Sequence, residues 1–246
     1  MPRNNDSTID RRTAMRMVAT IAASTFTMSD HIFAAPMIAV VDHLLLGVAD
    51  LDRGIAWVEE RTGIRPIIGG VHPGRGTRNA LMSLGDGKYL EVIAPDPAQT
   101  TYSFQIDVRT LKEPRLVTWA AGTKDIDAVA QRAKTAGVSV FGPSDGSRAR
   151  PDGTRLAWRT LGVGTSLAAG NVDPIPFFIQ WSAHTVHPSI DSPKGCALKE
   201  MRITHPNAPA VAKVLGGVGI EADVAIGSDA AIHATLSTPK GLVHLR

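Results

Sequence analysis

An apolar segment near the start of the chain constrains the fold most strongly. Residues 40–48 form a nearly continuous apolar run that ends at Gly47 and a cluster of acidic residues, which is typical of a buried strand that ends at a turn. A helix with acidic residues in its first turn is expected from residue 51 or 52. The strand contains one histidine, His43, and an imidazole among apolar side chains needs a polar partner. His43 is therefore either a core histidine bonded to a backbone carbonyl or a ligand for a metal or substrate.

A second apolar segment carries a single charged residue. Residues 89–95 are typical of a strand, and alternation places Tyr89, Glu91 and Ile93 on one face. A buried carboxylate is costly unless it is paired, hydrogen-bonded or bound to a metal. His43 and Glu91 are therefore expected to be partners.

The order of these elements resembles that of a known family. The expected order is a strand with histidine, a helix, two strands and a strand with glutamate. This order resembles the βαβββ module of the vicinal oxygen chelate superfamily, which includes glyoxalase I and the extradiol dioxygenases. The Gly-rich stretch with His72-Pro73-Gly74, followed by Tyr89-Leu90-Glu91, is similar to the glyoxalase-like branch. The resemblance extends over roughly residues 40–189. It implies an α+β fold of repeated βαβββ modules, whose curved mixed sheets form a cleft.

Three parts of the chain are expected. Residues 1–36 differ in composition from the rest, residues 37–190 hold two βαβββ modules, and residues 191–246 form a third half-module. The second module repeats the pattern of Gly, two residues, Asp, apolar residue and Asp, in residues 122–127 as in 47–52. The Gly-rich residues 69–76 and the polar residues 142–153 are predicted to be irregular loops. The third unit either packs as an additional half-barrel or completes a homodimer.

The resemblance implies a metal site and a substrate site. Metal sites of this superfamily take ligands from the first and last strand of each module. In this chain those positions hold His43 and Glu91 in the first module, and Thr118 and Gln180 in the second. We expect His43, Glu91 and Gln180 to hold a divalent ion that chelates two oxygens of a small substrate and stabilises an enolate or oxyanion. Glu91 would also shuttle a proton, and His43 would assist it. Expected substrate contacts are His72, Arg78, Asn79, Trp181 and His187.

Two classes of function remain open. The first is an enzyme with isomerase or lyase chemistry on a small oxygen-rich substrate; an extradiol dioxygenase fits less well, because a set of two histidines and one glutamate is not evident. The second is a metal-free protein that binds and sequesters a small molecule, since Thr118 is a poor ligand and Gln180 a neutral one. In that case His43 and Glu91 form a hydrogen-bonded pair beside an apolar pocket. Its expected aromatic lining is Trp57, Trp119, Phe178 and Trp181.

Composition excludes several other classes. The net charge is +3 and the basic residues are scattered, so nucleic acid is not an expected partner. The Gly-rich stretch has no following Gly-Lys-Ser/Thr, so no nucleotide cofactor is expected. Cys196 is the only cysteine, which excludes an internal disulfide and a Cys-rich zinc site.

The N-terminal residues 1–36 are typical of an export signal. Arg11-Arg12 precedes a mildly apolar run over residues 15–28, and small residues follow before Pro36. Paired arginines favour the twin-arginine type, which would place the protein in the periplasm or outside the cell. The alternative is a disordered extension or surface helix on a cytoplasmic protein. The run is too short for a stable membrane span.

N-terminal sequencing of the protein purified from its host tests the export signal. We expect the mature chain to begin near residue 36, because the small residues that signal cleavage end there. A chain that begins at Met1 or Pro2 would contradict the prediction.

Overall fold

The computed structural model describes residues 35–150 and 152–246, so the predicted signal lies outside it except for its last two residues. The strands are β1 (Ala35–Pro36), β2 (Val41–Gly47), β3 (Ile67–His72), β4 (Thr77–Ser83), β5 (Tyr89–Pro95), β6 (Arg115–Gly122), β7 (Ser139–Ala149), β8 (Arg155–Gly164), β9 (Phe177–Trp181), β10 (Ala197–His205), β11 (Ile220–Glu221), β12 (Val224–Ile226), β13 (Ala231–Thr238) and β14 (Gly241–Leu245). The helices are α1 (Met37–Val40), α2 (Leu51–Thr62), the 3-10 turn η1 (Val108–Thr110), α3 (Ile126–Thr135), α4 (Pro188–Asp191) and α5 (Ala208–Gly217).

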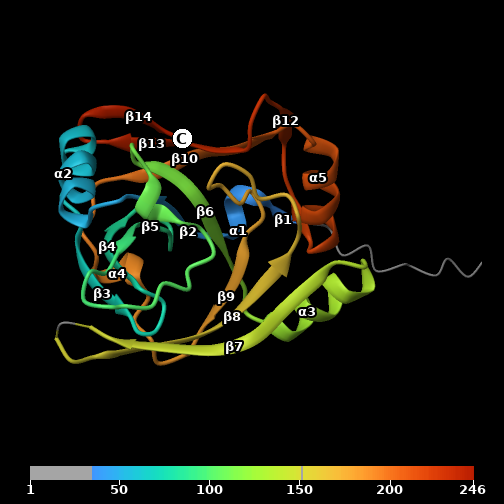
Figure 1. Ribbon diagram of the computed structural model, residues 1–246, viewed down its shortest axis with the longest axis horizontal. Coiled ribbons are helices and arrows are strands. Elements are labelled where there is room, and N and C mark those ends of the chain that lie inside the picture. The colour runs from blue at the N-terminus through green and yellow to red at the C-terminus, as the bar shows by residue number, and fades with distance from the viewer. Residues whose placement is uncertain (1–34, 151) are drawn as a thin grey trace, which may run out of the picture. The chain divides into compact units, whose positions relative to one another are not determined.

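An eight-stranded sheet dominates the structure (Figure 1). Its strand order is β3-β4-β5-β2-β6-β9-β8-β7. Each half has the same plan, because β2 is parallel to β5 as β6 is to β9, and the halves meet where β2 and β6 run antiparallel. The sheet curls until its two edge strands, β3 and β7, come into contact. The α+β fold of βαβββ modules with curved mixed sheets is thereby confirmed.

The repeated acidic motif begins the helix of each half. The side chain of Asp50 accepts a hydrogen bond from the backbone N–H of Arg53 at the start of α2, and Asp125 accepts one from Ala128 at the start of α3. These are N-caps, which satisfy N–H groups that have no partner within the helix. Among the described residues, no helix is long and apolar enough to cross a membrane.

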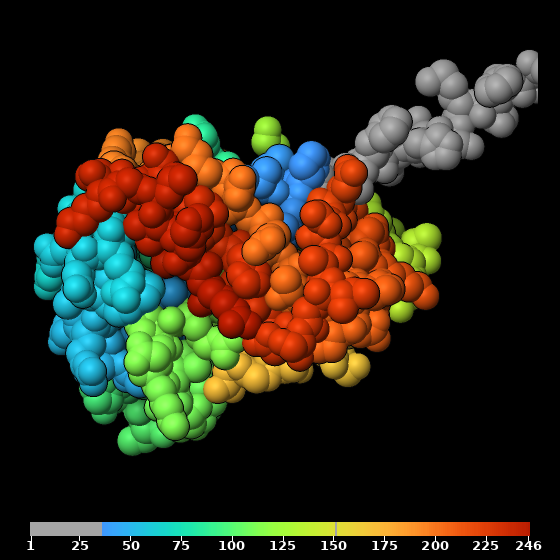
Figure 2. Space-filling model, turned by 90° about the horizontal axis from the view of Figure 1, so that it is seen from above, coloured from blue at the N-terminus to red at the C-terminus, as the bar shows by residue number. Residues whose placement is uncertain are grey.

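One hydrophobic core joins the eight-stranded sheet to the C-terminal strands. Leu44 of β2, Trp119 of β6, Ile203 of β10 and Leu236 of β13 all belong to it and are fully buried. The C-terminal sheet has the order β12-β10-β13-β14, and β14 lies against α2. Figure 2 shows these strands, in red, beside α2, in cyan. The C-terminal unit therefore covers apolar side chains of the first two modules.

Two segments predicted as irregular loops contain substantial strand. The Gly-rich residues 69–76 continue β3 as far as His72, and only residues 73–76 form a turn. β7 extends to Ala149 and pairs with β8 along its length, with a register shift between Phe141 and Ser144. Glycine and polar side chains weaken the strand pattern in a sequence, but pairing to a neighbouring strand satisfies their backbone all the same. Both predictions were wrong for this reason.

Replacing Leu236 by alanine tests the shared core. We expect Leu236→Ala to lower the free energy of unfolding by about 2–5 kcal/mol, because it removes a fully buried side chain. All four tryptophans precede residue 190, so their fluorescence reports on the first two modules. Urea unfolding followed by this signal should shift for Leu236→Ala. For the control Leu242→Ala, the free energy of unfolding should stay within about 0.5 kcal/mol of the wild-type value, because Leu242 is 66% exposed. An unchanged tryptophan transition in Leu236→Ala would show that the C-terminal unit unfolds separately.

Candidate functional site

A bulge in β2 brings Asp42 next to His43. Simple alternation predicts the two side chains on opposite faces, but the pairing of β2 with β6 shifts register between Val41 and His43. As a result, Oδ1 of Asp42 lies 2.7 Å from Nδ1 of His43. Both residues are buried. The partner of His43 is thus a neighbouring carboxylate, and the sequence pattern gave no sign of it.

Asp42 also binds side chains from the end of the second module. Its Oδ2 accepts a hydrogen bond from Nε1 of Trp181 at 2.9 Å and lies 3.1 Å from Nε2 of His187. Burial raises the pKa of Asp42, but hydrogen bonds with His187 and His43 outweigh it and hold the pKa well below its usual range. Asp42 is therefore an anion at neutral pH that fixes the orientation of the His43 ring.

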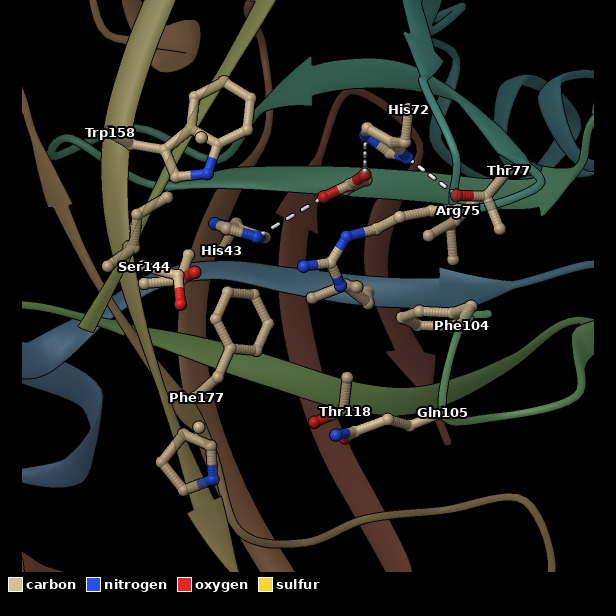
Figure 3. A pocket seen from close by; sticks show the side chains of 18 of the residues that line it. His43, His72, Arg75, Thr77, Phe104, Gln105, Thr118, Ser144, Trp158 and Phe177 are labelled. Carbon is tan, nitrogen blue, oxygen red and sulfur yellow. Dashed lines mark hydrogen bonds and ion pairs between the residues drawn. The ribbon is translucent and has the colours of Figure 1, made fainter. Parts of the chain in front are cut away.

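Glu91 lies on the other side of His43. Its Oε2 is 3.3 Å from Nε2 of His43, while its Oε1 accepts a hydrogen bond from Nδ2 of Asn79 at 2.7 Å. His72 contributes Nε2 at 3.6 Å from Oε1, and its Nδ1 lies 2.8 Å from Oγ1 of Thr77 (Figure 3). Burial lowers the pKa of His72, which favours its neutral form. The predicted pair of His43 and Glu91 is therefore the centre of a polar cluster.

The cluster faces a cavity of about 560 Å³ enclosed by the curled sheet. Figure 3 shows side chains from both halves of the sheet around it, with Phe177 and Trp158 on one side and Arg75 and Phe104 on the other. The Tyr89 ring stacks on His43 with centroids 4.4 Å apart. This size suits a small organic ligand.

The structure separates the predicted site residues into two groups. His43, Glu91, His72, Asn79, Thr118 and Trp181 line the cavity. Gln180 does not, because its side chain bonds the backbone of Ile126 and Lys124 at the start of α3. Arg78 and His187 also lie outside the cavity lining. On β9, alternation turns Phe177, Ile179 and Trp181 toward the cavity, and Gln180 away from it.

Most of the aromatic residues expected around the pocket also lie elsewhere. Trp57, Trp119 and Phe178 pack in or against the main core. The Nε1–H of Trp119 donates to the carbonyl of Pro174 at 2.9 Å. Their places in the lining are taken by Phe104, Phe177 and Trp158, among others. An apolar side chain in a strand fits core and pocket equally well by sequence, so only the register decides.

Arg148 is a site residue that the sequence did not indicate. It comes from the far end of β7 and lines the cavity with 7% of its surface exposed. Its guanidinium donates to the carbonyl of Gly69 on β3, across the closing edge of the sheet. Burial lowers its pKa, and Glu91 and Tyr89 are near enough to affect it electrostatically. A polar segment predicted as a loop carried no signal for this placement.

The expected metal site does not assemble as predicted. Asp42 holds Nδ1 of His43 in the way that carboxylates orient metal-binding histidines, and Glu91 is adjacent, so two of the three donors are in place. The third donor, Gln180, is bonded to the start of α3. Within the described residues, no group of three His, Cys, Asp or Glu side chains is arranged to hold an ion. His43, Glu91 and Gln180 therefore do not form the predicted metal site, and the proposed reaction uses no metal.

Comparisons with known proteins agree with this geometry. Residues 41–219 match a family described as the glyoxalase-like domain. A solved structure of a hypothetical protein from Staphylococcus aureus is 16% identical, with a match over 84% of this chain and 98% of that chain and a TM-score of 0.62. Methylmalonyl-CoA epimerase from Mycobacterium tuberculosis is 21% identical over 61% of this chain and 92% of that chain, with a TM-score of 0.39. A search of curated proteins gave no match.

The family match decides the class of the protein. It covers most of the chain, including both halves of the eight-stranded sheet and every residue of the polar cluster. The chain belongs to the glyoxalase-like domain family of the vicinal oxygen chelate superfamily. The Staphylococcus aureus structure supports the same fold.

Replacing Asp42 by asparagine tests its part in the site. We expect Asp42→Asn to lower the free energy of unfolding at pH 7 by about 3 kcal/mol, because an amide cannot accept from His43, His187 and Trp181 as a carboxylate does. The matched control is Asp52→Asn, an exposed residue in the first turn of α2, which should change stability by about 1 kcal/mol or less. Equal losses in urea unfolding of the two variants would contradict the prediction.

Proposed function

We propose that the protein is a glyoxalase-like enzyme in which Glu91 moves a proton at a carbon next to a carbonyl group of a small oxygen-rich substrate. The observation that carries this proposal is the placement of the Glu91 carboxylate. It is 6% exposed, it faces the cavity, and it lies 3.3 Å from an imidazole whose other nitrogen is held by an anion. Positioned carboxylates of this kind act as general bases.

The surroundings of Glu91 support proton transfer. No arginine or lysine among the described residues lies within ion-pair distance of its carboxylate. Its neighbours are instead the amide of Asn79 and the imidazoles of His43 and His72, which orient the carboxylate. Each carboxylate oxygen has two lone-pair sites, so a carboxylate held in this way can still accept a substrate proton.

In the proposed step, Glu91 takes a proton from the carbon next to the carbonyl. The electrons of the C–H bond form a C=C bond, and the carbonyl electrons move to oxygen, which gives an enolate. The proton then returns to the opposite face of the same carbon or, where that carbon carries a hydroxyl whose proton moves to the enolate oxygen, to the former carbonyl carbon as the hydroxyl becomes the new carbonyl; alternatively, the carbonyl re-forms as a leaving group departs with its bonding electrons from the next carbon. The first outcome is isomerisation and the second is elimination, which are the two reaction types expected from the sequence.

Arg148 is placed to stabilise the negative charge that develops. It is buried, it lines the same cavity, and its charge interacts with Glu91 and Tyr89. A fixed cation in a site with little water stabilises an enolate oxygen more than it would in solution. The bond to Gly69 holds the guanidinium in place before the substrate arrives.

Hydrogen exchange in D2O tests the proposal directly. Pyruvate, phenylpyruvate and lactate serve as a first panel, and NMR follows the loss of the C–H signal next to the carbonyl or carboxylate. We expect the wild type to accelerate exchange of at least one compound, and Glu91→Gln to reduce that rate about 100-fold to 10,000-fold, because the amide cannot accept the proton. Glu200→Gln is the matched control, since Glu200 is exposed on β10 outside the cavity lining.

Two further outcomes separate this proposal from its alternatives. Saturable binding of a compound without any exchange would contradict an enzyme and favour a binding protein on the same fold. Dialysis against EDTA should leave exchange unchanged, because the chain's own residues carry the proposed step. Loss of exchange on dialysis, together with one equivalent of metal in wild type but not in His43→Ala, would overturn the metal-free mechanism.

A further inference from the structure

Arg75 presents a guanidinium without a partner to the cavity. It lies in the turn between β3 and β4, and Figure 3 shows its side chain extending into the pocket between His43 and Phe104. It makes no side-chain hydrogen bond or ion pair with any other residue of the described ranges, 35–150 and 152–246. Arg148, the other arginine of the lining, already donates to Gly69. Within the described part of the chain, Arg75 is therefore the arginine of the lining whose side chain has every donor free for a ligand.

The turn that carries Arg75 is locked to the connector that follows β5. The backbone N–H groups of Gly74 and Gly76 donate to the side chain of Gln99, at 2.9 and 3.3 Å. The carbonyl of Arg75 accepts from the backbone N–H of Ser103 at 3.1 Å. Gly76 has φ +72°, and a Cβ there would lie 2.2 Å from the carbonyl oxygen of Thr101. The backbone beneath Arg75 is thus held from both sides, which lowers the cost of placing its side chain on a ligand.

The charges around the cavity limit the ligand to a single negative charge. The lining holds two cations, Arg75 and Arg148, and three acidic residues, Glu91, Asp145 and Asp173. Burial raises the pKa of Asp173, but the lining still has two other acidic residues, Glu91 and Asp145, to match the two arginines in number. A phosphate dianion would meet a lining with no surplus of positive charge. A carboxylate has one charge and the planar shape that a guanidinium binds through two parallel hydrogen bonds.

The rest of the lining favours an apolar body on the same ligand. Phe104, Phe177, Trp158 and Trp181 line the cavity, and the Trp158 and Trp181 rings meet edge to face with centroids 5.6 Å apart. Such a surface, with a few polar groups at one end, suits a ligand with an aromatic or branched apolar portion. We propose that Arg75 is the residue that selects the substrate of this site, by binding the carboxylate of a small monocarboxylic acid with an apolar body. That this ligand is also the substrate rests on the proposed function, but binding of the acid by Arg75 does not depend on that function.

Binding of matched acids and amides tests the proposal. The probes are phenylacetate, phenylpyruvate and 4-methylpentanoate, each beside its neutral amide, with phenyl phosphate as the dianion. Quenching of tryptophan fluorescence reports binding, since Trp158 and Trp181 line the cavity, and calorimetry checks each affinity. We expect at least one acid to bind the wild type about tenfold or more tightly than its amide and than phenyl phosphate.

Arginine variants assign the effect to one side chain. Arg75→Gln should weaken binding of that acid about tenfold and leave binding of its amide unchanged, and Arg75→Lys should recover part of the loss. Arg53→Gln is the matched control, because Arg53 is exposed on α2 outside the cavity lining. Equal affinity of wild type for every acid and its amide, or an acid affinity that Arg75→Gln does not change, would overturn the proposal. Tighter binding of phenyl phosphate than of every acid would overturn it as well.

Two glycines of the turn test whether the locked backbone matters. Gly74 and Gly76 have nearly the same φ, +73° and +72°, but a Cβ at Gly74 meets nothing within 4 Å. Gly74→Ala and Gly76→Ala carry the same backbone strain, but only the new Cβ of Gly76→Ala collides with the connector. We expect acid binding to weaken more in Gly76→Ala than in Gly74→Ala. If Gly76→Ala does not fold, the comparison of acid and amide in Arg75→Gln still decides the proposal.

The two proposals fail in different ways. Glu91→Gln should abolish hydrogen exchange while it keeps the preference for acid over amide, because it leaves Arg75 in place. Acid binding that depends on Arg75, with no exchange by wild type, would refute the enzyme and support the carboxylate site. Exchange that depends on Glu91, with no preference for acids, would support the enzyme and refute the carboxylate site.

Discussion

The buried carboxylate of Asp42 is the interaction on which the site depends. Three donors meet it: the adjacent His43 on β2 and, from a distant part of the chain, Trp181 at the end of β9 and His187 just before α4. A buried carboxylate requires partners of this kind, because its desolvation is otherwise too costly. One side chain therefore ties the first module to the end of the second and fixes the ring that faces Glu91.

This arrangement explains why the cavity lies where the two modules meet. β2 and β6 run side by side in the centre of the sheet, and each contributes a residue to the lining, His43 and Thr118. The curl of the sheet then brings its two edges together, where Arg148 of β7 donates to Gly69 of β3. The cavity thus combines the polar cluster of the first module with aromatic side chains of β8 and β9, while Thr118 and Arg148 of the second module add further polar groups.

The sequence predicted local features well and long-range placement poorly. The start of a helix near residue 51, the repeated acidic pattern and the isolated polar residues His43 and Glu91 in apolar strands follow from neighbouring residues alone. The bulge at Asp42 and the orientation of Gln180 depend on how one strand registers against another, and a shift of one residue reverses the face of every side chain. Arg148 lies about 79 residues from the backbone group it binds, a separation that no local pattern reports.

The uneven distribution of polar and apolar side chains around this cavity sets what it can recognise. Glu91, Asn79 and His72 of the first module form a hydrogen-bonded cluster on one side of the cavity, whereas β8 and β9 of the second module contribute the apolar side chains of Phe177, Ile179 and Trp158. A site with two polar walls suits a compact polyoxygenated ligand, because both of its sides need hydrogen bonds. In a site with one polar and one apolar wall, only the polar part of the ligand loses water at a cost in free energy. Burial of the apolar part instead contributes favourable free energy of binding. The ligand that matches this cavity is therefore amphipathic, with its reactive carbon at the boundary, where Glu91 and His43 lie.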